Sequence, residues 1–158
     1  MYVANIFGGR EHSLKVNQFI NNRKIINVYR ACAVLETVLD TALAPIGLTT
    51  AQWGSLRIIY ENPGCSGADI SRFAFVSPQA STTMLQRLEQ AKLITRRPPK
   101  RGRVLETYLT QRGEELLREG DNIVDETEAR FFSNFTPSEQ KDFNEYLLRS
   151  IANLDFNK

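Results

Sequence analysis

The residues best suited to chemistry lie on one predicted helix that begins after Ser77 and ends near Leu93. Its apolar residues recur at intervals of three and four and so share one face: Ala80, Met84, Leu88 and Ala91. The opposite face carries amides, hydroxyls and a guanidinium, without an acid: Gln79, Ser81, Thr82, Gln86 and Arg87. Such groups match the donors and acceptors that base edges present in the major groove of DNA. The alternative is an ordinary solvated helix face.

Two residues of this helix have a second interpretation. Ser77 can cap the helix, with Pro78 at the first helical position, or it can contact a phosphate. Arg87 lies partway along the helix and could instead brace the molecule through a carboxylate. The face is therefore a set of candidates for base and phosphate contacts.

A basic hairpin is predicted directly after this helix. Two strand-like runs, 93–97 and 104–109, flank a turn rich in proline and arginine. Cations without any acid occupy the stretch between Gln90 and Leu105: Lys92, Arg96, Arg97, Lys100, Arg101 and Arg103. Concentrated positive charge is what phosphate neutralisation needs, and Lys100, Arg101 and Arg103 are the candidates for it. The alternative is a solvated basic hairpin.

The elements that must hold this region are helices. Periodicity and cap signals predict them over 23–44, 51–60, 67–74, 110–132 and 137–154. The shorter ones are expected to bury Trp53, Leu56, Ile59 and Tyr60, and then Ala68, Ile70 and Phe73. The last is expected to bury Phe143, Tyr146, Leu147, Ile151 and Leu154. The fold class is mainly α with a small β-hairpin, as in a winged helix-turn-helix.

Composition restricts the function. The chain has 158 residues and a net charge of only +2, but acids outnumber bases over 113–145, so positive charge is concentrated at the hairpin. No apolar run reaches the roughly 18–20 residues that span a bilayer, and no signal-peptide core is seen. The sequence predicts a soluble, cytoplasmic protein with no membrane partner.

Catalytic and metal chemistry find no support in the sequence. The two cysteines, Cys32 and Cys65, and the single histidine, His12, form neither a metal-ligand pattern nor a disulfide framework. No phosphate-binding glycine loop, paired carboxylate or nucleophile motif is present. We therefore expect no enzyme activity, cofactor or metal. Cys32 is expected to be buried and inert on its helix, and Cys65 to be the more accessible thiol.

Several short motifs, in order and at the right spacing, resemble the multiple-antibiotic-resistance regulator (MarR) family of bacterial transcription factors. The resemblance covers about residues 23–154. Its pieces are Gly47-Leu48-Thr49 before Gln52-Trp53, Asn62-Pro63-Gly64, Ser77-Pro78-Gln79-Ala80-Ser81, Arg87-Leu88-Glu89, Leu93-Ile94-Thr95-Arg96-Arg97-Pro98 and Leu109-Thr110-Gln111-Arg112-Gly113.

The resemblance implies a single MarR-type domain over 1–158. Residues 21–46 and 110–156 would form dimerisation helices, and 47–109 a winged helix-turn-helix lobe. A homodimer would place its recognition helices in successive major grooves of a palindromic operator, with wings in the minor grooves. The family's wing has an acid where this chain has Arg101, and its wing arginine corresponds to Arg103. That departure leaves the conformation of the wing tip open.

The resemblance also implies a small effector, often aromatic or phenolic, that releases DNA. Candidate residues for such a pocket are Tyr29, Trp53, Arg57 and Tyr60, an apolar wall with one cation. For Trp53 a place in the core is the preferred interpretation, whereas Tyr29 and Tyr60 fit either a pocket or the core. The sequence thus predicts a dimeric, ligand-responsive repressor of transcription. The alternative is a winged-helix protein-interaction module whose basic hairpin binds an acidic partner.

Overall fold

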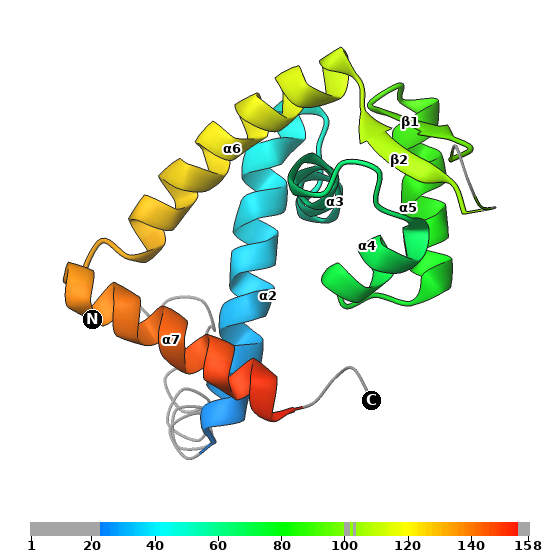
Figure 1. Cartoon of the computed structure of the whole chain (residues 1–158). Helices are drawn as coiled ribbons and strands as arrows, with labels where there is room; N and C mark the ends of the chain where they lie inside the picture. The colour runs from blue at the N-terminus through cyan, green and yellow to red at the C-terminus, as the bar shows by residue number, and fades with distance from the viewer. Residues whose placement is uncertain (1–22, 100–101, 103, 155–158) are drawn as a thin grey trace, which may run out of the picture. The chain divides into compact units, whose positions relative to one another are not determined.

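The computed structural model describes residues 23–99, 102 and 104–154. Lys100, Arg101 and Arg103, predicted as wing contacts, lie outside the described residues. The chain divides into two compact units, Met1–Val38 and Leu39–Lys158, and each is described by itself. The elements, shown in Figure 1, are α2 (Lys24–Leu43), η1 (Ala44–Ile46), α3 (Thr50–Glu61), α4 (Gly67–Phe73), α5 (Pro78–Gln90), β1 (Ile94–Arg97), β2 (Glu106–Leu109), α6 (Gln111–Phe131) and α7 (Pro137–Asn153).

The first unit contributes the first turns of α2, and its apolar side chains are exposed. Ile25, Val28, Tyr29 and Val34 all lie at the surface. Cys32 is exposed too, so the prediction that it is buried on an apolar stripe is wrong for the single chain. The described part of the chain has no single helix long and apolar enough to cross a membrane.

The second unit contains the hydrophobic core. It is built by α3, α5 and the start of the hairpin around residues from the end of α2 and the middle of α6: Leu43, Leu48, Leu56, Ile59, Ile70, Leu85, Leu88, Leu93, Ile94 and Leu117. Three residues predicted to be inward are exposed instead, namely Tyr60, Ala68 and Phe73. Ala68 and Phe73 are exposed because α4 is short. Its 7 residues bury only Ile70 and Ser71.

Side-chain caps begin most of these helices. Thr49 with Gln52, Ser66 with Asp69 and Thr136 with Glu139 form capping boxes, while Ser77 and Thr110 each accept one backbone N–H. The hydrogen bonds from Ser66 are the main cause that holds the pKa of Asp69 below its usual value. These signals are local in sequence, and they confirm the predicted starts of α3 to α7 to within a residue.

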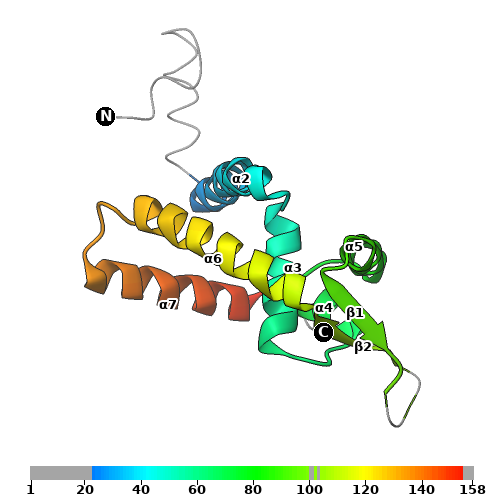
Figure 2. The same ribbon diagram turned by 90° about the horizontal axis from the view of Figure 1, so that it is seen from above.

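Both strands of the hairpin contact the neighbouring helices, and β2 also bonds the loop after α3. β1 and β2 pair antiparallel, with Ile94 opposite Leu109 and Arg97 opposite Glu106. The loop after α3 continues the sheet, because Gly64 N donates to Thr107 O at 2.8 Å and Thr107 N donates to Cys65 O at 3.1 Å. In Figure 1 and Figure 2, β1 lies beside α5, which is its main helix contact, and β2 contacts α3 and α6. The hairpin therefore cannot shift without moving this loop.

The α6–α7 elbow is an aromatic cluster. The rings of Phe131, Phe132, Phe135 and Phe143 meet mostly edge to face, with centroids 4.8–6.2 Å apart. Beyond this elbow α7 has no buried residue. Tyr146, Ile151 and Leu154 are exposed, and Phe143 and Leu147 are only half-buried. The predicted burial of these five residues is therefore wrong within one chain.

The first turn of α6 lies against the backbone that joins α5 to β1. Thr110 N donates to Leu93 O at 3.0 Å, and the Thr110 hydroxyl donates to Lys92 O at 2.7 Å. The approach is so close that a Cβ on Gly113 would lie 2.0 Å from Leu93 O. Only glycine fits at this contact.

Replacement of Gly113 by alanine tests this constraint. We expect Gly113→Ala to lower the free energy of unfolding by about 3 kcal/mol, because the added methyl must push two backbones apart. The matched control is Gly54→Ala inside α3, where an added Cβ meets nothing within 4 Å. The control should gain about 0.5–1 kcal/mol from helix propensity. Urea unfolding at one protein concentration measures both, and equal effects at the two sites would contradict the argument.

Candidate nucleic-acid interface

A short, rigid turn joins α4 to α5. Ser71 donates its hydroxyl to Val76 O at 2.6 Å, and Val76 N donates back to Ser71 O at 3.1 Å. Phe75 between them has a left-handed backbone with φ of 52°, which costs energy for a side chain with a Cβ. Two helices joined in this way by a few residues form a helix-turn-helix.

Ser81 fixes the angle between these helices and is not a surface residue. Its side chain is only 2% exposed, and its hydroxyl donates to Gly67 O in the first turn of α4 at 3.0 Å. The prediction that Ser81 contacts DNA is therefore wrong. The residue belongs to the inner face of α5, together with Leu85 and Leu88, and serves the site by orienting the helix.

The outward face of α5 carries the remaining candidates. Gln79, Thr82, Gln86 and Arg87 are all exposed, as is Ser77 at the cap. Sequence reasoning missed Thr83, which is also exposed and follows Gln79 at the helical spacing of four that could have identified it.

The two threonine hydroxyls on this face are already oriented. Thr82 donates to Pro78 O at 2.8 Å, and Thr83 donates to Gln79 O at 3.0 Å. Their oxygen lone pairs therefore face outward as acceptors, which suits a base amino group. Arg87 has no carboxylate within ion-pair distance among the described residues. Its guanidinium is thus available to a phosphate.

The predicted effector residues fall into different environments. Trp53 is half-buried, and its Nε1 donates to Asp121 Oδ1 at 2.9 Å. Arg57 donates to the other oxygen of Asp121 at 3.0 Å and to Glu61 at 2.9 Å. Asp121, which sequence reasoning missed, thus joins α3 to α6. The hydrogen bond to Glu61, followed by the charge of Asp121, raises the pKa of Arg57 above its usual value.

The other two effector candidates are exposed side chains. Tyr60 is 54% exposed, with the Arg57 guanidinium 5.8 Å from its ring centroid. Tyr29 belongs to the first unit and is 77% exposed. Trp53, Arg57 and Tyr60 therefore lie on one helix, α3. The Arg57 guanidinium already forms ion pairs with Asp121 and Glu61.

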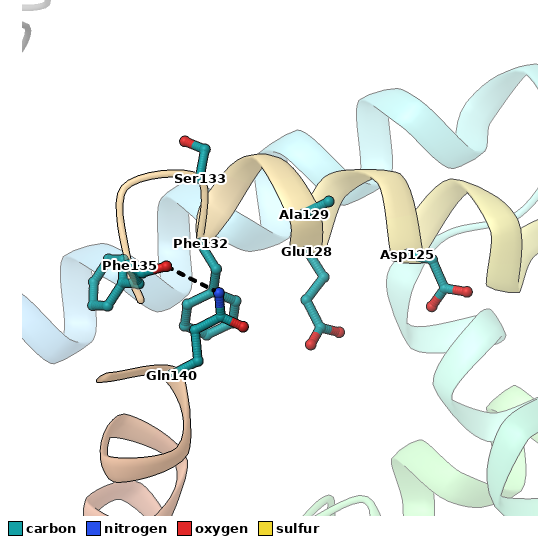
Figure 3. Close-up of a pocket in the computed structure, with 7 residues that line it drawn as sticks. All are labelled: Asp125, Glu128, Ala129, Phe132, Ser133, Phe135 and Gln140. Atoms are coloured by element: carbon teal, nitrogen blue, oxygen red, sulfur yellow. Dashed lines mark hydrogen bonds between the residues drawn. The ribbon is translucent and has the colours of Figure 1, made fainter. Parts of the chain in front are cut away.

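A pocket of about 550 Å³ lies at the α6–α7 elbow and was not predicted. Figure 3 shows the carboxylates of Asp125 and Glu128 directed to the same side of α6 as the Phe132 ring. Gln140 closes the pocket on the α7 side and donates to Phe135 O at 3.2 Å. Its lining residues include no cation, so an aromatic acid would meet repulsion here and not a partner.

The two cysteines have the reverse of their predicted exposures. Cys65 is buried, and its backbone bonds the hairpin through Thr107. Burial is the main cause that raises the pKa of this thiol to about 11. The thiolate fraction near neutral pH is correspondingly small, so Cys65 is an unreactive core residue.

Comparisons with known proteins place this geometry in a family. The family model described as MarR family matches residues 46–103, from η1 into the wing. The HTH-type transcriptional repressor Rv2887 of Mycobacterium tuberculosis is 36% identical over 121 residues, which cover 76% of this chain and 87% of the repressor.

Solved structures agree with this match. The crystal structure of Rv2887 in complex with DNA has a TM-score of 0.67 and 33% identity, over 80% of this chain and 96% of that one. The complex of Rv2887 with salicylic acid has a TM-score of 0.65 and 35% identity, over 80% and 95%. With a helix-turn-helix, a basic hairpin and relatives of this similarity, the chain belongs to the MarR family of transcriptional regulators.

Proposed function

We propose that this chain is a transcriptional repressor that binds double-stranded DNA as a homodimer in the cytoplasm and is released by a small aromatic acid, with no enzymatic activity. The observation that carries the proposal is the outward face of α5. It is polar, acid-free and exposed, and α4 holds it rigidly through Ser71 and Ser81. A helix of this kind beside a basic hairpin suits the major groove and its flanking phosphates.

DNA contacts are assigned by side-chain chemistry. We propose that Gln79, Thr82, Thr83 and Gln86 contact base edges. Ser77, Arg87, Lys100, Arg101 and Arg103 are the proposed phosphate or minor-groove contacts. Rv2887 has been crystallised with DNA, which supports the same use of the related lobe, residues 47–109, in this chain.

Dimerisation accounts for the exposed apolar surface outside that lobe. Apolar side chains lie exposed on α2 (Ile25, Val28 and Val34), on α7 (Leu148 and Ile151) and at its C-cap (Leu154). Large apolar side chains gathered on exposed helices are typical of subunit interfaces. We propose that residues 21–46 and 110–156 of two copies cover one another, and that the single domain of 1–158 is complete only as a dimer.

The effector is proposed to bind at Arg57. Structures of Rv2887 with salicylic acid and with p-aminosalicylic acid support an aromatic acid as the class of effector. In this chain the carboxylate of Asp121 already occupies Arg57 and the Trp53 indole, as an aromatic carboxylate would. An effector that replaced Asp121 would break the only side-chain ion pair between α3 and α6 in the described chain. Tyr60, on the same helix as Arg57, is the proposed aromatic wall.

A footprint on the DNA upstream of the protein's own coding region tests the repressor proposal. We expect a protected palindrome with half-sites about one helical turn apart. If a dimer neutralises about eight phosphates, log affinity falls with log salt at a slope near −7. Gln79→Ala should cost about 1–3 kcal/mol on the cognate site only, whereas Arg103→Ala should weaken binding to every sequence.

The alternative of a protein-interaction module predicts a different result. It gives neither a footprint nor a defined mobility shift, even at low salt, and only general retention on heparin. The matched control variant is Gln111→Ala, an amide on α6 outside the α5 face. If Gln111→Ala also lost the operator preference, the proposal that the outward face of α5 contacts base edges would be wrong.

Titration with salicylate tests the effector proposal. Displacement of Asp121 from the indole should change Trp53 fluorescence, since Trp53 is the single tryptophan, and should release the operator. Arg57→Ala should weaken salicylate binding at least tenfold, whereas salicylamide, which lacks the carboxylate, should release no DNA from the parent protein. Equal potency of acid and amide would eliminate Arg57 as the effector's partner.

A further inference from the structure

The outer face of the hairpin groups four side chains. Arg97 is opposite Glu106 and Thr95 is opposite Tyr108 in the register. Residues two apart in a strand share a face, so these four lie together. The opposite face points into the core, where Ile94 is 3% exposed and Thr107 is fully buried. Arg97 therefore stands on the exposed side of the wing.

Tyr108 forms a platform beneath Arg97. The guanidinium carbon lies 4.0 Å from the centroid of the Tyr108 ring, a cation–π contact that fixes the plane of the group. Stacking of this kind uses the face of the guanidinium and leaves its N–H donors at the edge directed outward. Arg97 is thus stacked in a defined orientation, and its guanidinium donates no hydrogen bond to another residue that the structure describes.

The platform itself is held in place. The Tyr108 hydroxyl donates to Glu106 Oε2 at 2.8 Å. Its ring end packs on Gly64, where the φ is +86° and an added Cβ would lie 2.9 Å from the Tyr108 oxygen. A glycine is therefore required below the ring, and the ring cannot tilt toward the loop after α3.

The Tyr108 hydroxyl is hydrogen-bonded to Glu106, the acid nearest to Arg97 in the strand register. Glu106 is the cross-strand partner of Arg97 and would ordinarily neutralise it. Its carboxylate instead accepts from Tyr108, and Arg97 has no ion pair within 4.0 Å among the described residues. Because Arg97 forms no ion pair with the described residues, its guanidinium can bind an external anion.

We propose that Arg97 is a phosphate contact at the base of the wing, and that Tyr108 is the residue that positions it. The inference rests on the proposed DNA-binding function and adds to it a contact that does not depend on the wing tip. A planar guanidinium presented edge-on matches two phosphate oxygens. Because phosphates carry no base identity, Arg97 contributes affinity and not sequence preference.

Salt-dependent binding of Arg97→Ala tests the contact. A dimer loses two phosphate contacts, which makes the slope of log affinity against log salt less steep by about 1.8 and lowers the affinity at 0.15 M salt about 30-fold on any DNA sequence. Arg97→Lys keeps the charge and most of the slope but loses the planar contact. The control, Arg118→Ala, removes the same charge from an exposed site on α6 and should leave the slope unchanged. An unchanged slope for Arg97→Ala overturns the proposal.

A double-mutant cycle tests the role of Tyr108. Tyr108→Leu should lower operator affinity when Arg97 is present and should cause no further loss in the Arg97→Ala background. Tyr108→Phe keeps the ring and should keep more of the affinity than leucine does. Equal losses from Tyr108→Leu in both backgrounds would show a merely structural role and overturn the assignment. Circular dichroism checks folding, and if Tyr108→Leu unfolds, Tyr108→Phe completes the cycle in its place.

The parent protein separates the two possible failures. If it gives no footprint at low salt, the proposed function fails and this inference fails with it. If it protects an operator while Arg97→Ala keeps the full salt slope, only the inference about Arg97 is wrong.

Discussion

The close approach of two backbones, at Leu93 and at the first turn of α6, is the constraint on which the second unit depends. Leu93 O accepts from Thr110 N, and no atom larger than hydrogen fits on Gly113 opposite it. Three elements meet here, because α5 ends, β1 begins and α6 begins within this contact. A side chain at Gly113 would separate the hairpin from α6 and with it change the angle at which the wing leaves α5.

From this junction the DNA-binding lobe is built by small polar groups inside an apolar core. Ser71 closes the turn before α5, and Ser81 bonds α5 to the first turn of α4. Their hydroxyls are buried and satisfied by backbone carbonyls, so they specify geometry at little cost in stability. On the other side of α3, the Asp121 carboxylate connects Trp53 and Arg57 to α6. The lobe is therefore joined to the long helix α6 by a polar contact made through one carboxylate.

Much of this fold could be predicted because its signals are local. Caps such as Thr49 with Gln52, and helical periodicity, predict the helices from α3 onward and the hairpin to within about three residues. The errors arose where a residue type is compatible with both faces of a helix. The polarity of serine predicts that Ser81 lies on the outward face of α5. A small hydroxyl can instead be buried when it donates to a backbone carbonyl, as Ser81 does to Gly67 O. Cys65 is in a loop, which predicts exposure, but this loop extends the sheet and is buried. Cys32 is on a helix with apolar spacing, but it is exposed in the single chain.

Other parts of the site depend on contacts that sequence spacing does not reveal. Trp53 and Asp121 are 68 residues apart in the chain, and no pattern within α3 predicts that its tryptophan and arginine share one acid. The stack of Arg97 on Tyr108 requires the strand register, which is set by the pairing of Ile94 with Leu109. The wing tip, with Arg101 at the position of the family's acid, stays a prediction.

The buried and the outward faces of α5 use different residues, and this has a consequence for how such regulators diversify. Ser81, Leu85 and Leu88 hold the helix, and they share no position with Gln79, Thr83 or Gln86 on its outward face. Substitutions on the outward face leave the helix's attachment intact and cost little stability. A duplicated gene can therefore acquire a different outward face on α5 while its product continues to fold. The residues that attach this helix and the residues that it exposes can change separately.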